Sequence, residues 1–181
     1  MPLKIVKKSV NKLSKEEISF INRQRIKEYG KEAKVNFKKE DKSAEFFFII
    51  NNKEIMAFGM LKPVEVDYQN KKYNILGMGR GLAIKKGQGY GKALALAGLN
   101  YLKKTGKTGL AFTERKNIGF FKKTGFKIKK DFIRKFRYKN QITGELVRDD
   151  DGDGVYYEGK NKLISKMLKN GGLAIIKVPF W

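Results

Sequence analysis

The segment Ile84–Leu94 reads IKKGQGYGKAL, with three glycines at alternate positions between an apolar run and a longer segment of helical periodicity. This order predicts a strand, a tight turn and the start of a helix. Glycines at every second position permit positive φ angles and let the backbone approach a ligand closely. The N–H groups of such a turn, together with the unpaired N–H groups of a helix start, can bind an anion. The segment therefore predicts an anion-binding loop, most naturally for a pyrophosphate.

Two better-known glycine loops do not fit this spacing. A Walker A loop needs a glycine five positions before the glycine of its Gly-Lys pair and then Ser or Thr, but position 86 is Lys and Ala93 follows Lys92. The dinucleotide fingerprint is G-x-G-x-x-G, whereas these glycines are spaced G-x-G-x-G. Both nucleotide-binding motifs are excluded, and a glycine-rich turn without a ligand is the simpler alternative.

A second motif lies one predicted helix and one predicted strand downstream. The segment Asn117–Phe126 reads NIGFFKKTGF. The glycine loop resembles the acyl-CoA pyrophosphate loop of the GNAT superfamily of N-acetyltransferases, Arg/Gln-x-x-Gly-x-Gly/Ala, matched by Lys86, Gly89 and Gly91. The downstream segment resembles that family's Asn…Phe-Tyr-x-x-x-Gly-Phe signature. Two motifs in this order are far more specific than either alone.

The resemblance implies an α/β (α+β) fold with a mixed, mostly antiparallel central sheet, flanking helices and splayed central strands. It implies a single domain over residues 1–181, with a cofactor core at about 72–128 and C-terminal strands over 129–181. The implied activity is direct transfer of an acetyl group from acetyl-CoA to a primary amine, with a small molecule as the expected acceptor. A macromolecular acceptor (aminoacyl-tRNA, a nucleic-acid base or a protein Lys) and a catalytically weak CoA- or nucleic-acid-binding module stay open.

The resemblance also assigns cofactor-binding residues. In the family the pantetheine arm pairs with the strand before the loop, and the loop holds the pyrophosphate. The positions are Leu82, Ala83, Ile84, Lys86, Gly87, Gln88, Gly89, Tyr90, Gly91, Lys92, Asn117, Phe120 and Phe121. Only Lys85 separates the strand end at Ile84 from the loop, a tighter connection than the family usually has.

Catalytic residues are harder to assign. With no Cys and no His, an enzyme thioester and an imidazole base are excluded, which leaves a carboxylate, a water, a terminus or a Lys of lowered pKa. Glu114, at the end of a short strand, is the first candidate, although a surface ion pair with Arg115 or Lys116 explains it equally well. Glu65 and Asp67 are weaker candidates, and the terminal carboxylate of Trp181 is a candidate for attracting a cationic amine.

The position of Phe121 departs from the family. Many family members have a Tyr there that protonates the departing thiolate, and Phe has no hydroxyl. Three alternatives stay open: another residue protonates the thiolate, the thiolate leaves unprotonated, or the protein has little turnover.

Composition limits the expected localisation and partners of the protein. The chain has 181 residues, a formal net charge of +23 and no long apolar run, so we expect a cytoplasmic protein without a membrane partner. The charge attracts polyanions, and nucleic acid is therefore a candidate partner. A second copy of the chain, in a homodimer, is another candidate. Lys greatly outnumbers Arg, however, which favours a compositional background over a dedicated nucleic-acid surface.

The remaining elements follow from periodicity and turn signals. Ser14 and Glu17 predict a capping box for a helix that ends at Gly30. The acidic run 149–154 resembles half of a calcium loop but is expected to be a turn, because position twelve would be Lys160. We predict strands over 3–6, 44–51, 54–66, 72–84, 108–113, 127–138 and 173–181, and helices over 91–104 and 117–123.

Overall fold

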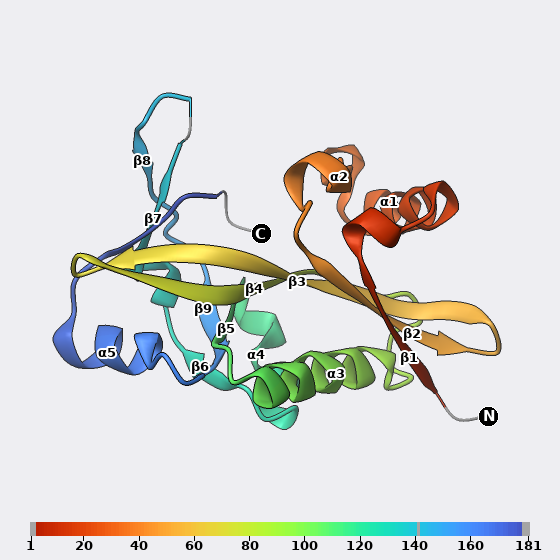
Figure 1. Ribbon diagram of the computed structural model, residues 1–181. Helices are drawn as coiled ribbons and strands as arrows, with labels where there is room; N and C mark the ends of the chain where they lie inside the picture. The colour runs from red at the N-terminus through yellow and green to blue at the C-terminus, as the bar shows by residue number, and fades with distance from the viewer. Residues whose placement is uncertain (1–2, 141, 179–181) are drawn as a thin grey trace. The chain divides into compact units, whose positions relative to one another are not determined.

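The computed structural model describes residues 3–140 and 142–178, and Figure 1 labels its elements. The strands are β1 (Lys4–Ser9), β2 (Glu45–Asn51), β3 (Glu54–Tyr68), β4 (Lys71–Ala83), β5 (Gly109–Thr113), β6 (Lys127–Lys129), β7 (Phe136–Lys139), β8 (Leu146–Val147), β9 (Asp153–Tyr157) and β10 (Ala174–Ile176). The helices are α1 (Lys15–Tyr29), α2 (Phe37–Glu40), α3 (Tyr90–Thr105), α4 (Ile118–Lys123) and α5 (Leu163–Asn170), with short 3-10 turns η1 (Val10–Lys12), η2 (Lys31–Ala33), η3 (Arg115–Asn117) and η4 (Phe132–Lys135).

The chain divides into two compact units. The first consists of Met1–Lys62 and Gly79–Ala97, and the second of Pro63–Met78 and Gly98–Trp181. Strands β3 and β4 and helix α3 each contribute residues to both. The single domain predicted over residues 1–181 stays a prediction.

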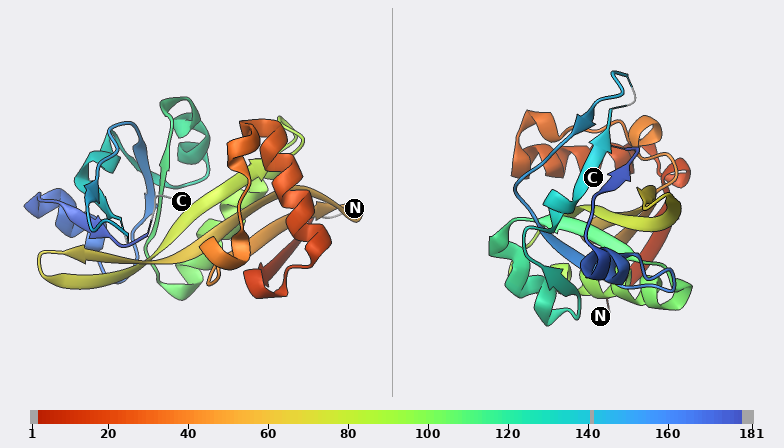
Figure 2. Two further views of the ribbon diagram at one scale, coloured as in Figure 1. Left: turned by 90° about the horizontal axis from the view of Figure 1, so that it is seen from above. Right: turned by 90° about the vertical axis from the view of Figure 1, so that its left-hand side faces the viewer.

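The first unit has a sheet in the order β1-β2-β3-β4, in which β2 pairs antiparallel with both β1 and β3. Helices α1 and α2 cover one face of it and the start of α3 covers the other (Figures 1 and 2). The predicted capping box is confirmed, since the Ser14 hydroxyl accepts from the Glu17 N–H and the Glu17 carboxylate accepts from the Ser14 N–H. Gly30 ends α1 with a φ of 88°.

Strand β2 supplies side chains to both faces of this sheet because successive residues alternate. Phe46 meets Phe37 of α2 edge to face, with ring centroids 5.3 Å apart, and stacks against Phe48 at 6.0 Å. On the other face, Ile49 packs in a cluster with Tyr90 and Leu94 of α3. Both faces of β2 are therefore buried, as its continuous apolar run predicts.

The second unit has the strand order β6-β9-β5-β4-β3-β10-β7-β8. The β4–β5 and β7–β10 pairs are parallel. The β3–β10, β5–β9, β6–β9 and β7–β8 pairs are antiparallel. Gln69 and Asn70 both have positive φ in the two-residue turn between β3 and β4, as a tight hairpin turn requires. Strand β5 pairs with β9 along all five residues but with β4 only through Gly109 and Leu110. This pattern is expected where two parallel strands separate.

One face of the second unit's sheet packs against α5. Val64, Val66 and Tyr68 alternate along β3 and enter a core that includes Leu163 and Met167 of α5. The Tyr68 hydroxyl donates to the Gly171 carbonyl at 2.5 Å, just after α5 ends. Burial and this bond fix the C-terminal helix to β3.

The predicted long strand over 127–138 is wrong. The segment forms β6, the 3-10 turn η4 and β7, because Asp131 adopts a left-handed conformation with a φ of 52°. The Asp131 N–H donates to the Asp153 carboxylate at 2.7 Å, and Phe132 and Ile133 are then both buried. A straight strand would place those two neighbours on opposite faces.

The acidic run also differs from the prediction at its end. Asp153 is buried and opens β9, so only the preceding residues are irregular. Within residues 3–140 and 142–178, no helix is long and apolar enough to span a membrane.

Candidate functional site

The predicted loop lies between the end of β4 at Ala83 and the start of α3 at Tyr90. Gly87 and Gly89 have φ angles of 78° and 82°. A Cβ atom built on either glycine would meet no heavy atom within 4 Å, so these positions need glycine for its conformation and not for space. The loop is exposed, and Gly91 and Lys92 continue it into the first turn of α3. This geometry confirms the strand, turn and helix start read from the sequence.

Tyr90 forms the buried base of the loop. Its ring packs with Ile49 and Met56, and its hydroxyl accepts a hydrogen bond of 2.9 Å from the Asn51 side-chain amide. The Ala93 N–H donates to the Gly89 carbonyl at 3.0 Å, which joins the loop to the first helical turn. Tyr90 therefore anchors the C-terminal end of the loop to the core of the first unit.

Helix α1 contacts this region at two points. Lys86 forms an ion pair with Glu28, and the Tyr29 hydroxyl donates to the Gly81 carbonyl at 3.3 Å. The cationic residue of the motif thus has a carboxylate neighbour within the chain, which an incoming phosphate would have to compete with.

The backbone of β4 is irregular just before the loop, and we call its residues 79–82 the β4 bulge. Arg80 has a φ of 54° and lies between Gly79 and Gly81. A residue other than glycine held in this region costs on the order of 1–3 kcal/mol, and such positions concentrate at functional sites. A Cβ atom at Gly59 of β3 would lie 3.3 Å from the Gly81 Cα, so the two backbones approach closely at the bulge. Glycine inside a strand is typical of a bulge or a close backbone approach, but the positive φ here falls on Arg80 and not on a glycine.

A buried group of charges surrounds the Arg80 side chain, and we call Asp41, Lys62 and Arg80 the Asp41 cluster. Lys62 Nζ donates to one Asp41 carboxylate oxygen at 2.9 Å, and Arg80 Nε donates to the other at 3.3 Å. Asp41 is fully buried. Burial, with the neighbouring charge of Arg80, lowers the pKa of the Arg25 guanidinium nearby. The bulge is therefore held in a desolvated, charged environment.

The strand residues predicted to receive the pantetheine arm are only partly available. Leu82 is buried, and Ala83 and Ile84 are half-buried. The Ile84 N–H already donates to the Met56 carbonyl at 2.9 Å. Backbone pairing with a ligand would have to use groups other than this one.

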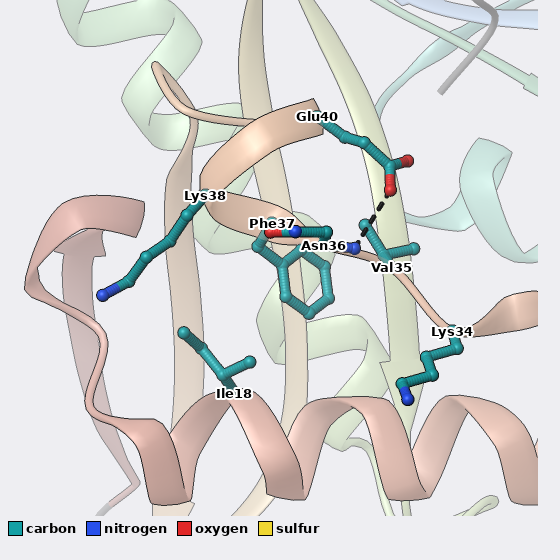
Figure 3. A pocket seen from close by; sticks show the side chains of 7 residues that line it. All are labelled: Ile18, Lys34, Val35, Asn36, Phe37, Lys38 and Glu40. Atoms are coloured by element: carbon teal, nitrogen blue, oxygen red, sulfur yellow. Dashed lines mark hydrogen bonds between the residues drawn. The ribbon is translucent and has the colours of Figure 1, made fainter.

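A pocket of about 490 Å³ lies between α1 and α2. Ile18 of α1 and Phe37 of α2 point toward one another in it, and Lys34 and Lys38 lie on opposite sides (Figure 3). Glu40 also lines the pocket, and its carboxylate accepts from the Asn36 N–H at 3.0 Å. The pocket thus combines an apolar base with ionic groups.

The second motif belongs to the second unit. The Asn117 side-chain amide donates to the Thr113 hydroxyl at 3.1 Å. Phe120 is exposed, and the Phe121 ring contacts the rings of Phe120 and Phe126 edge to face at 5.0 and 6.0 Å. The sequence order of the motif is thus preserved in a short helix, but Phe121 offers no proton.

The proposed bases differ in their surroundings. Glu114 is exposed and forms an ion pair of 2.6 Å with Lys116, which is the surface alternative read from the sequence. Lys177 and Lys72 bond to Glu65 and lower its pKa, which makes that carboxylate a weaker base. Asp67 lies 3.7 Å from Lys177 and has one buried oxygen without a hydrogen bond among the described residues.

Trp181, the other catalytic candidate, lies outside the described residues.

Sequence reasoning missed the Asp41 cluster and the Tyr29 contact. The Gly-Arg-Gly run inside β4 was the one local signal, because an Arg between two glycines in a strand marks an irregular backbone.

No family model matches the sequence, and no curated protein matches it significantly. Solved structures do match. The GNAT family N-acetyltransferase YhbS from Escherichia coli in complex with CoA aligns with a TM-score of 0.60 at 15% identity, covering 98% of this chain and 91% of that one. Escherichia coli ElaA aligns at 0.57 and 12% identity, covering 87% of this chain and 100% of its own.

A third structure, the Bacillus subtilis acetyltransferase in complex with CoA, has a TM-score of 0.54 at 17% identity, over 87% of this chain and 99% of that chain. At identities this low, the structural likeness establishes the architecture alone. That architecture agrees with the mixed, mostly antiparallel sheet and its flanking helices. The chain therefore has the fold of the GNAT superfamily of N-acetyltransferases.

Proposed function

We propose that this protein is an N-acetyltransferase that moves an acetyl group from acetyl-CoA directly to a primary amine. The observation that carries the proposal is the loop of residues 84–89, with two positive-φ glycines between β4 and α3, on a GNAT fold. A fold alone does not define chemistry, so the local geometry of this loop is the stronger support.

The loop has the properties that a pyrophosphate requires. It is exposed, it is free of side-chain atoms above Gly87 and Gly89, and it leads into the N-terminus of a helix of 16 residues. Lys85 and Lys92 add exposed positive charge. Two of the solved structures named above contain CoA, which supports CoA as the ligand. Asn117, Phe120 and Phe121 stay predicted contacts.

Acetyl-CoA would supply the acetyl group as a thioester. In the transfer the amine nitrogen forms a bond to the thioester carbonyl carbon, the carbon–sulfur bond breaks, the nitrogen loses a proton and the thiolate gains one. The chain must position the amine and accept its proton. Glu114 remains the first candidate for that proton, and its exposure suits a base that passes the proton to solvent.

A small-molecule acceptor fits the first unit best. The pocket between α1 and α2 has the volume of a small-ligand site and an apolar base at Ile18 and Phe37. Lys34, Lys38 and Glu40 offer charges of both signs, which suits an amine that also carries an acidic group. A polyanionic acceptor is favoured only by the net charge of +23.

The test is calorimetric titration with acetyl-CoA at moderate salt, with CoA, ATP and inorganic polyphosphate as controls for charge attraction. We expect micromolar, salt-tolerant binding of acetyl-CoA and CoA, and loss of binding in Gly89→Glu. Gly144→Glu is the matched control, because Gly144 also has a positive φ (74°) and open surroundings but lies in the β7–β8 connection. Equal, salt-sensitive binding of all four ligands would contradict the proposal.

Phe121 favours a second candidate, a CoA-binding module with little turnover. Its ring packs against Phe120 and Phe126, and no hydroxyl stands at this position to protonate a thiolate. Incubation with acetyl-CoA and a panel of primary amines, read out by free thiol, separates the two. Thiol release that requires an amine supports the transferase, whereas tight binding without release across the panel supports the module.

A further inference from the structure

Burying the charged groups of the Asp41 cluster is energetically unfavourable in a unit as small as the first. Both oxygens of a fully buried carboxylate receive a cationic donor, and Lys62 also donates to the Glu40 carbonyl at 2.7 Å. Replacing such buried ion pairs by apolar side chains is often neutral or stabilising, so overall stability does not explain them. What the cluster does achieve is a fixed position for the Arg80 side chain.

Arg80 is an unusual residue for its backbone conformation. Glycine adopts a φ of 54° at little cost, and two glycines flank this position, yet the residue that carries the positive φ has a long side chain. Arg is therefore not present for its backbone preference. Its guanidinium reaches Asp41 and comes within 3.8 Å of Glu40, so the side chain can compensate for the backbone.

The partner of Arg80 is itself held firmly. Asp41 follows α2 directly, and its N–H donates to the Phe37 carbonyl at 2.9 Å. The Asn36 side chain caps α2, and the Phe37 ring packs on Phe46 of β2. The carboxylate thus stands on a packed element and not on a mobile loop.

We propose that Asp41 is a positioning residue that acts through Arg80: it holds the β4 bulge, and with it the backbone at Gly81 and Leu82, in the conformation that receives the acyl-donor arm. This inference rests on the proposed function for its catalytic consequence. The reacting thioester, and not the pyrophosphate at the glycine loop, is the part of the donor that depends on the bulge.

Two substitutions of Arg80 give a sharp test. Arg80→Ala and Arg80→Gly both remove the guanidinium and leave the Asp41–Lys62 pair in place, but only alanine resists a positive φ. We expect kcat to fall at least tenfold in Arg80→Ala and in Asp41→Asn, with the dissociation constant of CoA changed less than threefold. Arg80→Gly should retain most of the wild-type kcat. Equal losses in the Ala and Gly variants would overturn the proposal.

A second readout does not depend on turnover. Hydrogen–deuterium exchange of the peptide over residues 79–83, without acyl donor, should accelerate in Arg80→Ala and Asp41→Asn but less in Arg80→Gly. Unchanged exchange in the first two would overturn the role of the cluster even in an active enzyme. If the wild type binds no acetyl-CoA, the proposed function fails, and the exchange rates still decide whether Asp41 holds the bulge. If Asp41→Asn does not fold, kcat and hydrogen–deuterium exchange are both measured on Arg80→Ala alone.

Discussion

The hydroxyl of Tyr29, the last residue of α1, donates a hydrogen bond to the carbonyl of Gly81, which lies in the bulged part of β4. The bond joins residues 52 positions apart in the sequence. It brings the end of the first helix to the strand that leads into the glycine loop. The region in which we place the acyl-donor site is thus supported by α1 as well as by β3.

Tyr29→Phe should lower the free energy of unfolding by about 0.5–1.5 kcal/mol, the usual net value of one hydrogen bond. The lower end is expected, because Tyr29 is half exposed and water can replace the phenol at the Gly81 carbonyl. Urea denaturation measures the change. A loss above about 3 kcal/mol would mean that the ring, and not the hydroxyl bond, is being disturbed.

Gly89→Ala and Gly98→Ala should change stability in opposite directions. Gly89 has a φ of 82°, so alanine there is strained and should destabilise by about 1 kcal/mol or more. Gly98 lies inside α3 with open space around its Cβ position, so alanine should stabilise by about 0.5–1 kcal/mol. Thermal unfolding of the two variants measures both changes, and a Gly89→Ala variant as stable as wild type or more stable would contradict the loop conformation.

Asp153→Ala should destabilise the second unit by about 1–3 kcal/mol. The buried Asp153 carboxylate accepts from the Asp131 N–H, and its removal leaves that donor without its partner at a left-handed residue. Asp150→Ala is the control, because Asp150 is exposed and pairs with Arg148 at the surface, where ion pairs contribute little. Chemical denaturation should show a clear loss for the first variant only.

The Glu65 carboxylate should make stability depend on acid. Hydrogen bonds from Lys177 and Lys72 lower its pKa below the usual 4.5. A lowered folded-state pKa stabilises the fold above about pH 4.5, and that contribution is lost as the pH falls through the folded-state value. Glu65→Gln should therefore be less stable than wild type near neutral pH and converge with it in acid. A constant difference across the titration would argue against this assignment.

Phe121→Tyr should raise kcat if thiolate protonation limits the proposed transfer. General acids contribute about 10²–10⁴-fold to such steps, which sets the upper bound for the gain. The measurement is initial rates of thiol release with a fixed amine. Phe126→Tyr is the control, since it adds a hydroxyl to a neighbouring ring that the motif does not align with the usual Tyr. Equal rates in wild type and Phe121→Tyr would show that the hydroxyl is not needed.

Local signals in the sequence were sufficient for much of this protein. The glycine spacing predicted the turn conformation at Gly87 and Gly89, Ser14 and Glu17 predicted the start of α1, and alternation or continuous apolar runs predicted most strands. These features depend on residues a few positions apart, whose φ preferences and side-chain bonds act within one turn or one strand. The motif pair also indicated the GNAT fold that the solved structures confirm.

Tertiary structure alone decided the rest. Asp41 and Arg80 are 39 residues apart, and nothing near either one in the sequence indicates that they form a buried ion pair. The break at Asp131 likewise depends on Asp153, 22 residues away, which stabilises a left-handed residue that alternation alone reads as strand. Such contacts follow from which elements pack together, because a buried charge or a positive φ is tolerated only where a distant partner compensates its cost.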